Sequence, residues 1–128
     1  VFLSKTRKNF KLPFPQEYLF AIQKIIKDAN QELMVVQNEE SQILGTFQLS
    51  FIQYLTYKGG IRAQIEAVRI HKNYRGLGKQ MFQWAIERAK TRKSHVLQLT
   101  TDKKRPQAIK FYEDLGFKAT HEGMKMHF

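Results

Sequence analysis

A short segment in the middle of the chain carries residue types that bind phosphate groups. It reads Arg75-Gly76-Leu77-Gly78-Lys79 and lies between an apolar run that ends at Ile70 and a helical apolar pattern that begins at Met81. Glycine lets the backbone approach a ligand closely, and the first N–H groups of a helix have no partner inside it. The helix dipole adds partial positive charge there. The order strand, basic glycine loop, helix therefore predicts an anion site suited to a pyrophosphate, with a plain turn as the alternative.

Two common nucleotide motifs are excluded at this loop. A Walker phosphate loop needs the spacing G-x-x-x-x-G-K-[ST], which the segment lacks. The dinucleotide motif G-x-G-x-x-G fails because position 81 is Met. A phosphate ligand at this loop would therefore be bound by residues whose spacing differs from that of both motifs.

The composition bounds the class of protein. The 128 residues, of which 42% are hydrophobic, are enough for one compact domain, which we expect to span residues 1–128. There is no cysteine, which excludes disulfides and thiolate metal sites and suits a reducing cytoplasm, so we expect a cytoplasmic location. No apolar run reaches membrane-spanning length and no signal peptide is visible, so we expect no membrane partner. The chain begins with Val rather than Met, so its start need not be the native one.

The net charge of +11 favours polyanionic partners, which could be nucleic acid, an anionic membrane or a phosphorylated cofactor. Part of this charge is grouped in the glycine loop and in Lys103-Lys104-Arg105. The alternative for such a run is a solvated loop.

Hydrophobic periodicity predicts a mixed α+β order of elements. We expect the chain to form a hairpin with its tip at Lys58-Gly59-Gly60, followed by a strand-helix-strand unit. The pattern predicts helices over 16–29, 77–92 and 106–115, strands over 33–37, 43–51, 61–70 and 95–101, and one or two final strands within 117–128.

The strand over 61–70 changes phase near Ala67. Apolar side chains occupy one phase up to this point, and Val68 and Ile70 occupy the other. A slip in a two-residue period is what a β-bulge produces, and a bulge frees backbone groups from the ladder. A regular strand whose end is buried on both faces explains the same pattern equally well.

Three ordered segments together resemble the GNAT superfamily of acyl-CoA-dependent N-acyltransferases. They are the run over 65–70, the loop over 75–80, and the segment over 108–117, which reads AIKFYEDLGF and is close to the family signature A-x-x-F-Y-E-x-x-G-F. The resemblance covers nearly all of the chain from about residue 16. It implies a mixed, mostly antiparallel sheet flanked by helices, with a V-shaped splay between strands ending near Ile70 and Thr101.

One family element has no counterpart in the sequence. The first strand of the family is apparently missing, because residues 1–10 show no alternating pattern. Either the chain lacks it, or the numbering begins inside a longer protein. An unpaired sheet edge would invite contact with a second copy, so a homodimer is a possible assembly.

The resemblance implies that the chain binds acetyl-CoA. The family pattern before the helix, [Q/R]-x-x-G-x-[G/A], matches at Arg75 and Gly78 and departs at Gln80. Family members hold the pyrophosphate on this loop and pair the pantetheine arm with the preceding strand. The implied cofactor-binding residues are Val68, Arg69, Ile70, Arg75, Gly76, Leu77, Gly78, Lys79, Gln80, Arg105, Ala108 and Phe111.

Two residues are implied to be catalytic. Tyr112 would be the general acid for the departing CoA thiolate, with core packing as the alternative for a helical Tyr. Glu66 would be the base for the amine, directly or through water, with a solvent-facing strand residue as the alternative. The four histidines are isolated and have no metal-ligand spacing, so we expect no metal site.

The resulting hypothesis is an N-acetyltransferase in which a primary amine of a small molecule or peptide attacks acetyl-CoA directly. The first alternative is a catalytically inactive acyl-CoA-binding module with the same fold. The second alternative is a basic nucleic-acid-binding module, which would place aromatic residues among Lys and Arg on an exposed sheet face. The aromatic residues here instead occupy the positions of the hydrophobic pattern that are predicted to face the core.

Overall fold

The computed structural model of the chain describes residues 15–128 and divides into two compact units, one reaching to Gln98 and one running from Leu99 to Phe128. The question of the missing first strand falls on residues 1–14, which lie outside the described residues. The single domain over 1–128 stays a prediction.

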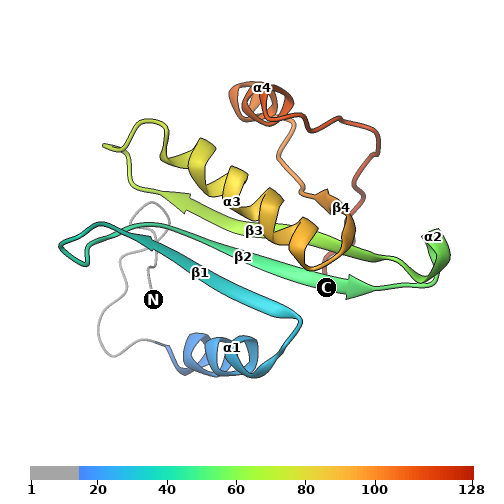
Figure 1. Cartoon of the computed structure of the whole chain (residues 1–128), viewed down its shortest axis with the longest axis horizontal. Helices are drawn as coiled ribbons and strands as arrows, with labels where there is room; N and C mark the ends of the chain where they lie inside the picture. The colour runs from blue at the N-terminus through green and yellow to red at the C-terminus, as the bar shows by residue number, and fades with distance from the viewer. Residues whose placement is uncertain (1–14) are drawn as a thin grey trace. The chain divides into compact units, whose positions relative to one another are not determined.

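The first unit holds a four-stranded sheet in the order β1-β2-β3-β4 (Figure 1). The two pairs β1–β2 and β2–β3 are antiparallel, whereas β3 and β4 run parallel with α3 between them in the chain. This open, mostly antiparallel mixed sheet flanked by helices confirms the predicted fold class. The elements are α1 (Gln16–Lys27), β1 (Gln31–Gln37), β2 (Ile43–Gln53), α2 (Thr56–Gly59), β3 (Ile61–Ile70), α3 (Leu77–Thr91) and β4 (Ser94–Gln98).

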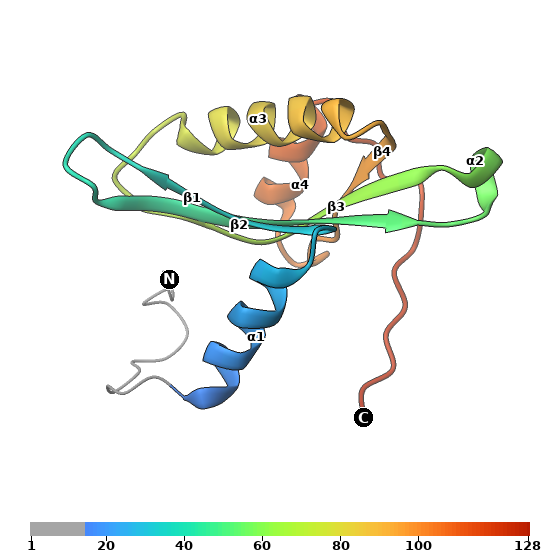
Figure 2. The ribbon, with the colours of Figure 1, turned by 60° about the horizontal axis from the view of Figure 1, so that its bottom comes forward.

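The core of this unit lies between the sheet and α3, which covers one face, while α1 projects from the other (Figure 2). Alternate residues of β2 and β3 point to this core because successive strand side chains point to opposite faces. At its edge, the Phe47 and Trp84 rings meet edge to face with centroids 5.8 Å apart. The buried apolar residues are Leu44, Phe47, Leu49, Phe51, Ala63, Ile65, Leu77, Met81, Phe82, Ala85 and Ala89.

An ion-pair clamp joins the C-terminal end of α3 to β1. The Glu32 carboxylate accepts from Arg88 Nε at 3.0 Å and from Arg92 Nη1 at 3.0 Å. The hydrogen bond from Arg88 is the main cause that lowers the pKa of Glu32 below its ordinary value. Arg92 also lies over the Phe51 ring, 4.1 Å from its centroid. The clamp therefore fixes the helix to a strand that is two places away from β3 in the sheet.

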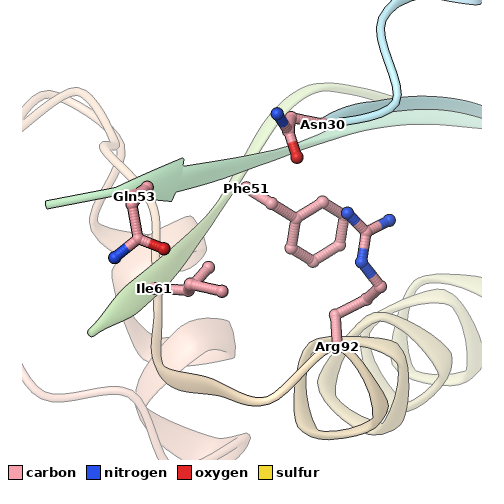
Figure 3. Close-up of a pocket in the computed structure, with 5 residues that line it drawn as sticks. All are labelled: Asn30, Phe51, Gln53, Ile61 and Arg92. Atoms are coloured by element: carbon pink, nitrogen blue, oxygen red, sulfur yellow. The ribbon is translucent and has the colours of Figure 1, made fainter. Parts of the chain in front are cut away.

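A small cavity opens beside this clamp (Figure 3). It is lined by Asn30, Phe51, Gln53, Ile61 and Arg92 and has a volume of about 60 Å³. Ligand sites in proteins are typically about 300–1,000 Å³. This cavity is too small to hold a nucleotide cofactor.

The phase slip in β3 is a β-bulge. Thr46 on β2 pairs with Arg69, but Gln48 pairs with Glu66, so one β2 residue opposes two on β3. Ala67 at the bulge has a positive φ of 53°. The prediction of a bulge is confirmed over the alternative of a doubly buried strand end.

The antiparallel strands β2 and β3 form the predicted hairpin, and Lys58-Gly59-Gly60 lies in its connection. Tyr57, Lys58 and Gly59 all have positive φ, so the chain makes a left-handed turn within α2. Residues with a Cβ rarely adopt this conformation in succession, because each costs about 1–2 kcal/mol. The Tyr57 ring is stacked on His95 with centroids 4.4 Å apart, which supplies a tertiary contact that offsets part of this strain.

The second unit contains α4 (Pro106–Asp114). Proline occupies its first turn, as predicted. Gly116 follows the helix with φ 100°, and its N–H donates to the Glu113 carbonyl at 2.9 Å. Together with a bond from Phe117 N–H to the Tyr112 carbonyl at 3.0 Å, this is the Schellman motif expected of a C-terminal glycine.

The predicted strands within 117–128 are wrong, because the structure assigns no strand there. Met124, Met126 and Phe128 alternate with polar residues but lie exposed. Alternation is a local property, whereas a strand exists only through hydrogen bonds to a neighbour. The strand predicted over 95–101 likewise ends earlier, at Gln98.

Candidate functional site

The loop between β3 and α3 presents an open helix N-terminus. The start of this loop is joined to β2 by the His71 N–H, which donates to the Leu44 carbonyl at 2.7 Å. Gly76 caps α3 in the left-handed region with φ 79°, and the bond from Gln80 N–H to the Gly76 carbonyl, 3.2 Å long, is the first of the helix. The N–H groups of residues 77–79 precede that bond. They are the donors that a helix offers to an anion.

Two positively charged residues lie beside or among these donors in the sequence. Arg75 and Lys79 are exposed, whereas Leu77 is buried and anchors the first turn of α3 in the core. Gln80, where the family pattern has a small residue, is exposed as well. A Cβ built on Gly76 would meet no atom within 4 Å, so its left-handed φ, rather than crowding, accounts for glycine at this position.

The strand before the loop, β3, pairs with β4 over only part of its length. The parallel ladder of β3 and β4 ends at Gln64 and Gln98, whereas β3 continues to Ile70. Residues 68–70, predicted to meet the pantetheine arm, are thus beyond that ladder. The Arg69 guanidinium donates to the Val68 carbonyl at 2.8 Å, so a ligand using this carbonyl would share or displace that bond.

Glu66 lies on the face of β3 opposite to Ala63 and Ile65, which are buried toward α3. It is exposed and accepts a hydrogen bond from Gln64 Nε2. Gln64 in turn accepts from Gln98 Nε2 at 2.8 Å. The sequence analysis missed both glutamines. The signal that could have found Gln64 is its place in the same strand phase as Glu66.

In the second unit, α4 places Tyr112 between two aromatic rings. The Tyr112 ring meets Phe111 at 5.5 Å and Phe117 at 6.0 Å, both edge to face. Tyr112 and Phe111 are half-buried. The Schellman motif fixes the backbone at Tyr112, and the two ring contacts restrict its side chain.

The N-terminal end of α4 forms a basic hollow of about 370 Å³, lined by Lys104, Arg105, Pro106, Gln107 and Ala108. Two residues of the predicted cofactor set, Arg105 and Ala108, are therefore brought together. Lys103 instead pairs with Glu122 at 2.7 Å. A hydrogen bond between these two raises the pKa of Lys103 and lowers that of Glu122. This lysine is thus already engaged by a carboxylate.

The described residues 15–128 contain no group of three or more His, Asp or Glu side chains placed to hold a metal ion. The same part of the chain contains no helix with the length and apolar character that crossing a membrane requires. His95 packs beside Tyr54 and Tyr57, and His71 packs against Tyr74. These contacts favour packing roles for both histidines.

The predicted site residues thus form two groups, one in each unit. Glu66, residues 68–70 and the loop over 75–80 follow one another along β3 and into α3. Arg105, Ala108, Phe111 and Tyr112 lie on or beside α4. The first group offers anion donors and a carboxylate, and the second offers a phenol and basic side chains.

Comparison with known proteins identifies relatives over most of the chain. The sequence model of the Acetyltransferase (GNAT) family matches residues 2–117. Among curated proteins, none matches.

Solved structures give similar results. A transcriptional regulator from Bacillus halodurans C-125 is 52% identical, with a TM-score of 0.89, over 97% of this chain and 83% of that chain. An acetyltransferase from Trypanosoma brucei is 25% identical, with a TM-score of 0.76, over 91% and 82%. A glucosamine-6-phosphate N-acetyltransferase from Arabidopsis thaliana is 20% identical, with a TM-score of 0.74, over 88% and 78%, which is a likeness of fold alone.

Proposed function

Because the chain belongs to the acetyltransferase (GNAT) family, we propose that it moves an acetyl group from acetyl-CoA to a primary amine by direct attack. The observation that carries the proposal is the order of features from β3 into α3: the end of the β4 ladder, a bulge, a basic glycine loop and an open helix N-terminus. Acetyl-CoA would supply the acetyl group as an activated thioester.

The donor set suits a cofactor that carries phosphates. The N–H groups of residues 77–79 and the charges of Arg75 and Lys79 would hold the pyrophosphate at the start of α3. Because the β3–β4 ladder ends at Gln64, the side of residues 68–70 that faces away from β2 would be available to the pantetheine arm. Lys104 and Arg105 in the hollow at α4 are further candidates for phosphate contacts.

Two side chains would move protons. Glu66 would take a proton from the attacking amine, directly or through water, since its carboxylate is exposed on the face of β3 opposite to α3. Tyr112 would donate its phenolic proton to the sulfur as the carbon–sulfur bond breaks. The new amide bond forms as the thioester bond is lost, so no covalent enzyme intermediate is needed, and the chain has no cysteine to carry one.

The acceptor would be an amine of low positive charge. The chain carries a net charge of +11, which disfavours the approach of a polycation unless acidic groups gather locally. Glu66 is the acidic residue that the proposed site supplies. An amino sugar or a peptide amine meets this condition better than a polyamine does.

The absence of cysteine makes the test direct, because a thiol reagent added to the protein and acetyl-CoA reports only released CoA. We expect calorimetry to detect acetyl-CoA binding. We expect the thiol assay to detect CoA release with at least one of three acceptors, namely an amino sugar, a lysine peptide and a polyamine. Binding without release for any acceptor would favour the inactive acyl-CoA-binding module. Absence of binding would overturn the proposal.

A second candidate function is nucleic-acid binding. It is favoured by the net charge and by the name of the 52% identical relative, a transcriptional regulator. Nucleic-acid binding through phosphates weakens steeply as salt rises. A filter-binding titration with duplex DNA at two salt concentrations tests this candidate, and calorimetry with acetyl-CoA separates it from the first.

A further inference from the structure

A line of hydrogen bonds joins the end of β4 to Glu66 across the face of the sheet opposite to α3. Gln98 Nε2 donates to Gln64 Oε1 at 2.8 Å, and Gln64 Nε2 donates to Glu66 Oε1. Both glutamines are half-buried, whereas Glu66 is exposed. The line therefore runs from partly covered amides to a carboxylate that a molecule from solvent can reach.

The direction of the line follows from the chemistry of its last member. An ionised carboxylate can only accept, so the amide that faces it must present its NH₂ group. The Gln64 carbonyl oxygen is then the group left for Gln98, which must donate. The orientation of both amides is fixed by the charge of Glu66.

The backbone places these three side chains within reach. Gln64 and Gln98 are register partners and form the last pair of the β3–β4 ladder. Glu66 lies two residues further along β3 on the same face. The line therefore begins where β4 leaves β3 and ends at the carboxylate beside the bulge.

We propose that Gln64 is a positioning residue for Glu66 and that Gln98 anchors Gln64. The inference rests on the proposed function, in which Glu66 takes the proton of the amine. An exposed glutamate has three freely rotating side-chain bonds, and a hydrogen bond from Gln64 to Oε1 selects the rotamers that keep this bond. Oε2 is then held where an amine can meet it, which is the kind of preorientation that raises reaction rates.

A matched control lies on the neighbouring strand. Gln48 is the register partner of Glu66 on β2, and its side chain therefore lies on the same face. Its Nε2 donates instead to Gln31 Oε1 at 2.7 Å. Gln48→Leu thus removes an amide beside Glu66 without removing a hydrogen bond to it.

The test is a double-mutant cycle on acetyl transfer, measured by CoA release with acetyl-CoA and the best of the three acceptors named above. Gln64→Leu should lower kcat about tenfold, the lower end of what a hydrogen bond to a charged group contributes. The KM for acetyl-CoA should not change, and Gln48→Leu should transfer close to the parent rate. In a chain that already carries Glu66→Gln, Gln64→Leu should have no further effect, because a residue that acts through Glu66 needs its carboxylate.

The side-chain amide NMR signals of Gln64 provide a readout that needs no acceptor. They should shift in Glu66→Leu and in Gln98→Leu, and stay in place in Gln48→Leu. Signals of Gln64 that coincide in the parent and Glu66→Leu proteins would overturn the hydrogen-bonded line itself.

The outcomes separate this inference from the proposed function. If the Glu66→Gln variant transfers acetyl groups slowly while the Gln64→Leu variant transfers them at the parent rate, the positioning role is overturned and the base role stays intact. Equal, independent losses in both backgrounds also overturn it, since they indicate general loosening of β3. A Glu66→Gln variant at the parent rate overturns the base role, and the positioning role with it.

Discussion

The backbone N–H of Phe117 donates to the carbonyl of Tyr112 at 3.0 Å, and the two rings lie 6.0 Å apart. This bond closes the Schellman motif at the end of α4 and requires the left-handed conformation of Gly116 between them. The position of the proposed general acid therefore depends on a glycine four residues later in the chain.

Gly116→Ala should destabilise the protein by about 1–2 kcal/mol, the cost of a left-handed residue with a Cβ. A Cβ at this position would meet no atom within 4 Å, so the effect comes from the backbone alone. Urea unfolding measures the change. Gly123→Ala, also in open space but without positive φ, should stay within about 0.5 kcal/mol of the parent protein.

Tyr112→Phe should fold and bind acetyl-CoA as the parent does, because the ring and its two aromatic contacts remain. Loss of the proton donor should slow acetyl transfer about 10²- to 10⁴-fold. The thiol-release assay across pH checks this, with Tyr57→Phe as the control. A parent rate at every pH would show that the phenol only packs and that water protonates the thiolate.

Gly78→Val should weaken acetyl-CoA binding, because a β-branched side chain at the start of α3 would obstruct the approach of phosphates to the backbone. Titration calorimetry measures the affinity. Gly123→Val, outside the loop, should bind as the parent does. Unchanged affinity in Gly78→Val would remove the cofactor assignment from this loop.

Ala67→Gly should stabilise the protein by about 0.5–1 kcal/mol, since glycine relieves the positive φ at the bulge. The matched control should change the free energy of unfolding in the opposite direction. Ala63 is fully buried on the same strand, so Ala63→Gly should cost about 1–2 kcal/mol through lost burial and added backbone freedom. Thermal unfolding compares the two, and equal signs would contradict the strain at Ala67.

Glu32→Gln should destabilise the protein by about 1–3 kcal/mol at neutral pH, because it removes charged hydrogen bonds to Arg88 and Arg92. The folded-state pKa of Glu32 is lowered, so its contribution is complete above the ordinary value of 4.5 and is lost as pH falls through the folded pKa. The stability difference between parent and variant should therefore shrink toward acidic pH. Glu87→Gln is the control, since its pair with Lys90 is exposed and should contribute about 0–1 kcal/mol.

Features that depend on neighbouring residues in sequence were predictable. The bulge at Ala67 could be predicted because it shifts the side-chain period of its own strand. The end of α4 could be predicted because Gly116 completes a motif within a few residues of the helix. The start of α3 directly after the glycine loop follows in the same way from the residues that precede the helix.

Features that depend on a partner elsewhere in the chain were not predictable. Residues 124–128 alternate as a strand does, yet alternation does not supply the neighbour that a strand needs. The left-handed turn at Tyr57 is accompanied by stacking on His95, a residue of β4. The line from Gln98 to Glu66 requires the register of β3 and β4, which no single segment carries.

The clamp on Glu32 also bears on the order in which the protein folds. Its two hydrogen-bonded partners lie 56 and 60 residues away along the chain, so the clamp closes a long loop. Closing a long loop early carries an entropic cost that local hairpins avoid. The β1–β2 and β2–β3 hairpins should therefore form before the clamp does. An interaction made after the transition state retards unfolding more than it accelerates folding. We therefore expect Glu32 to contribute to the lifetime of the native state rather than to the speed of reaching it.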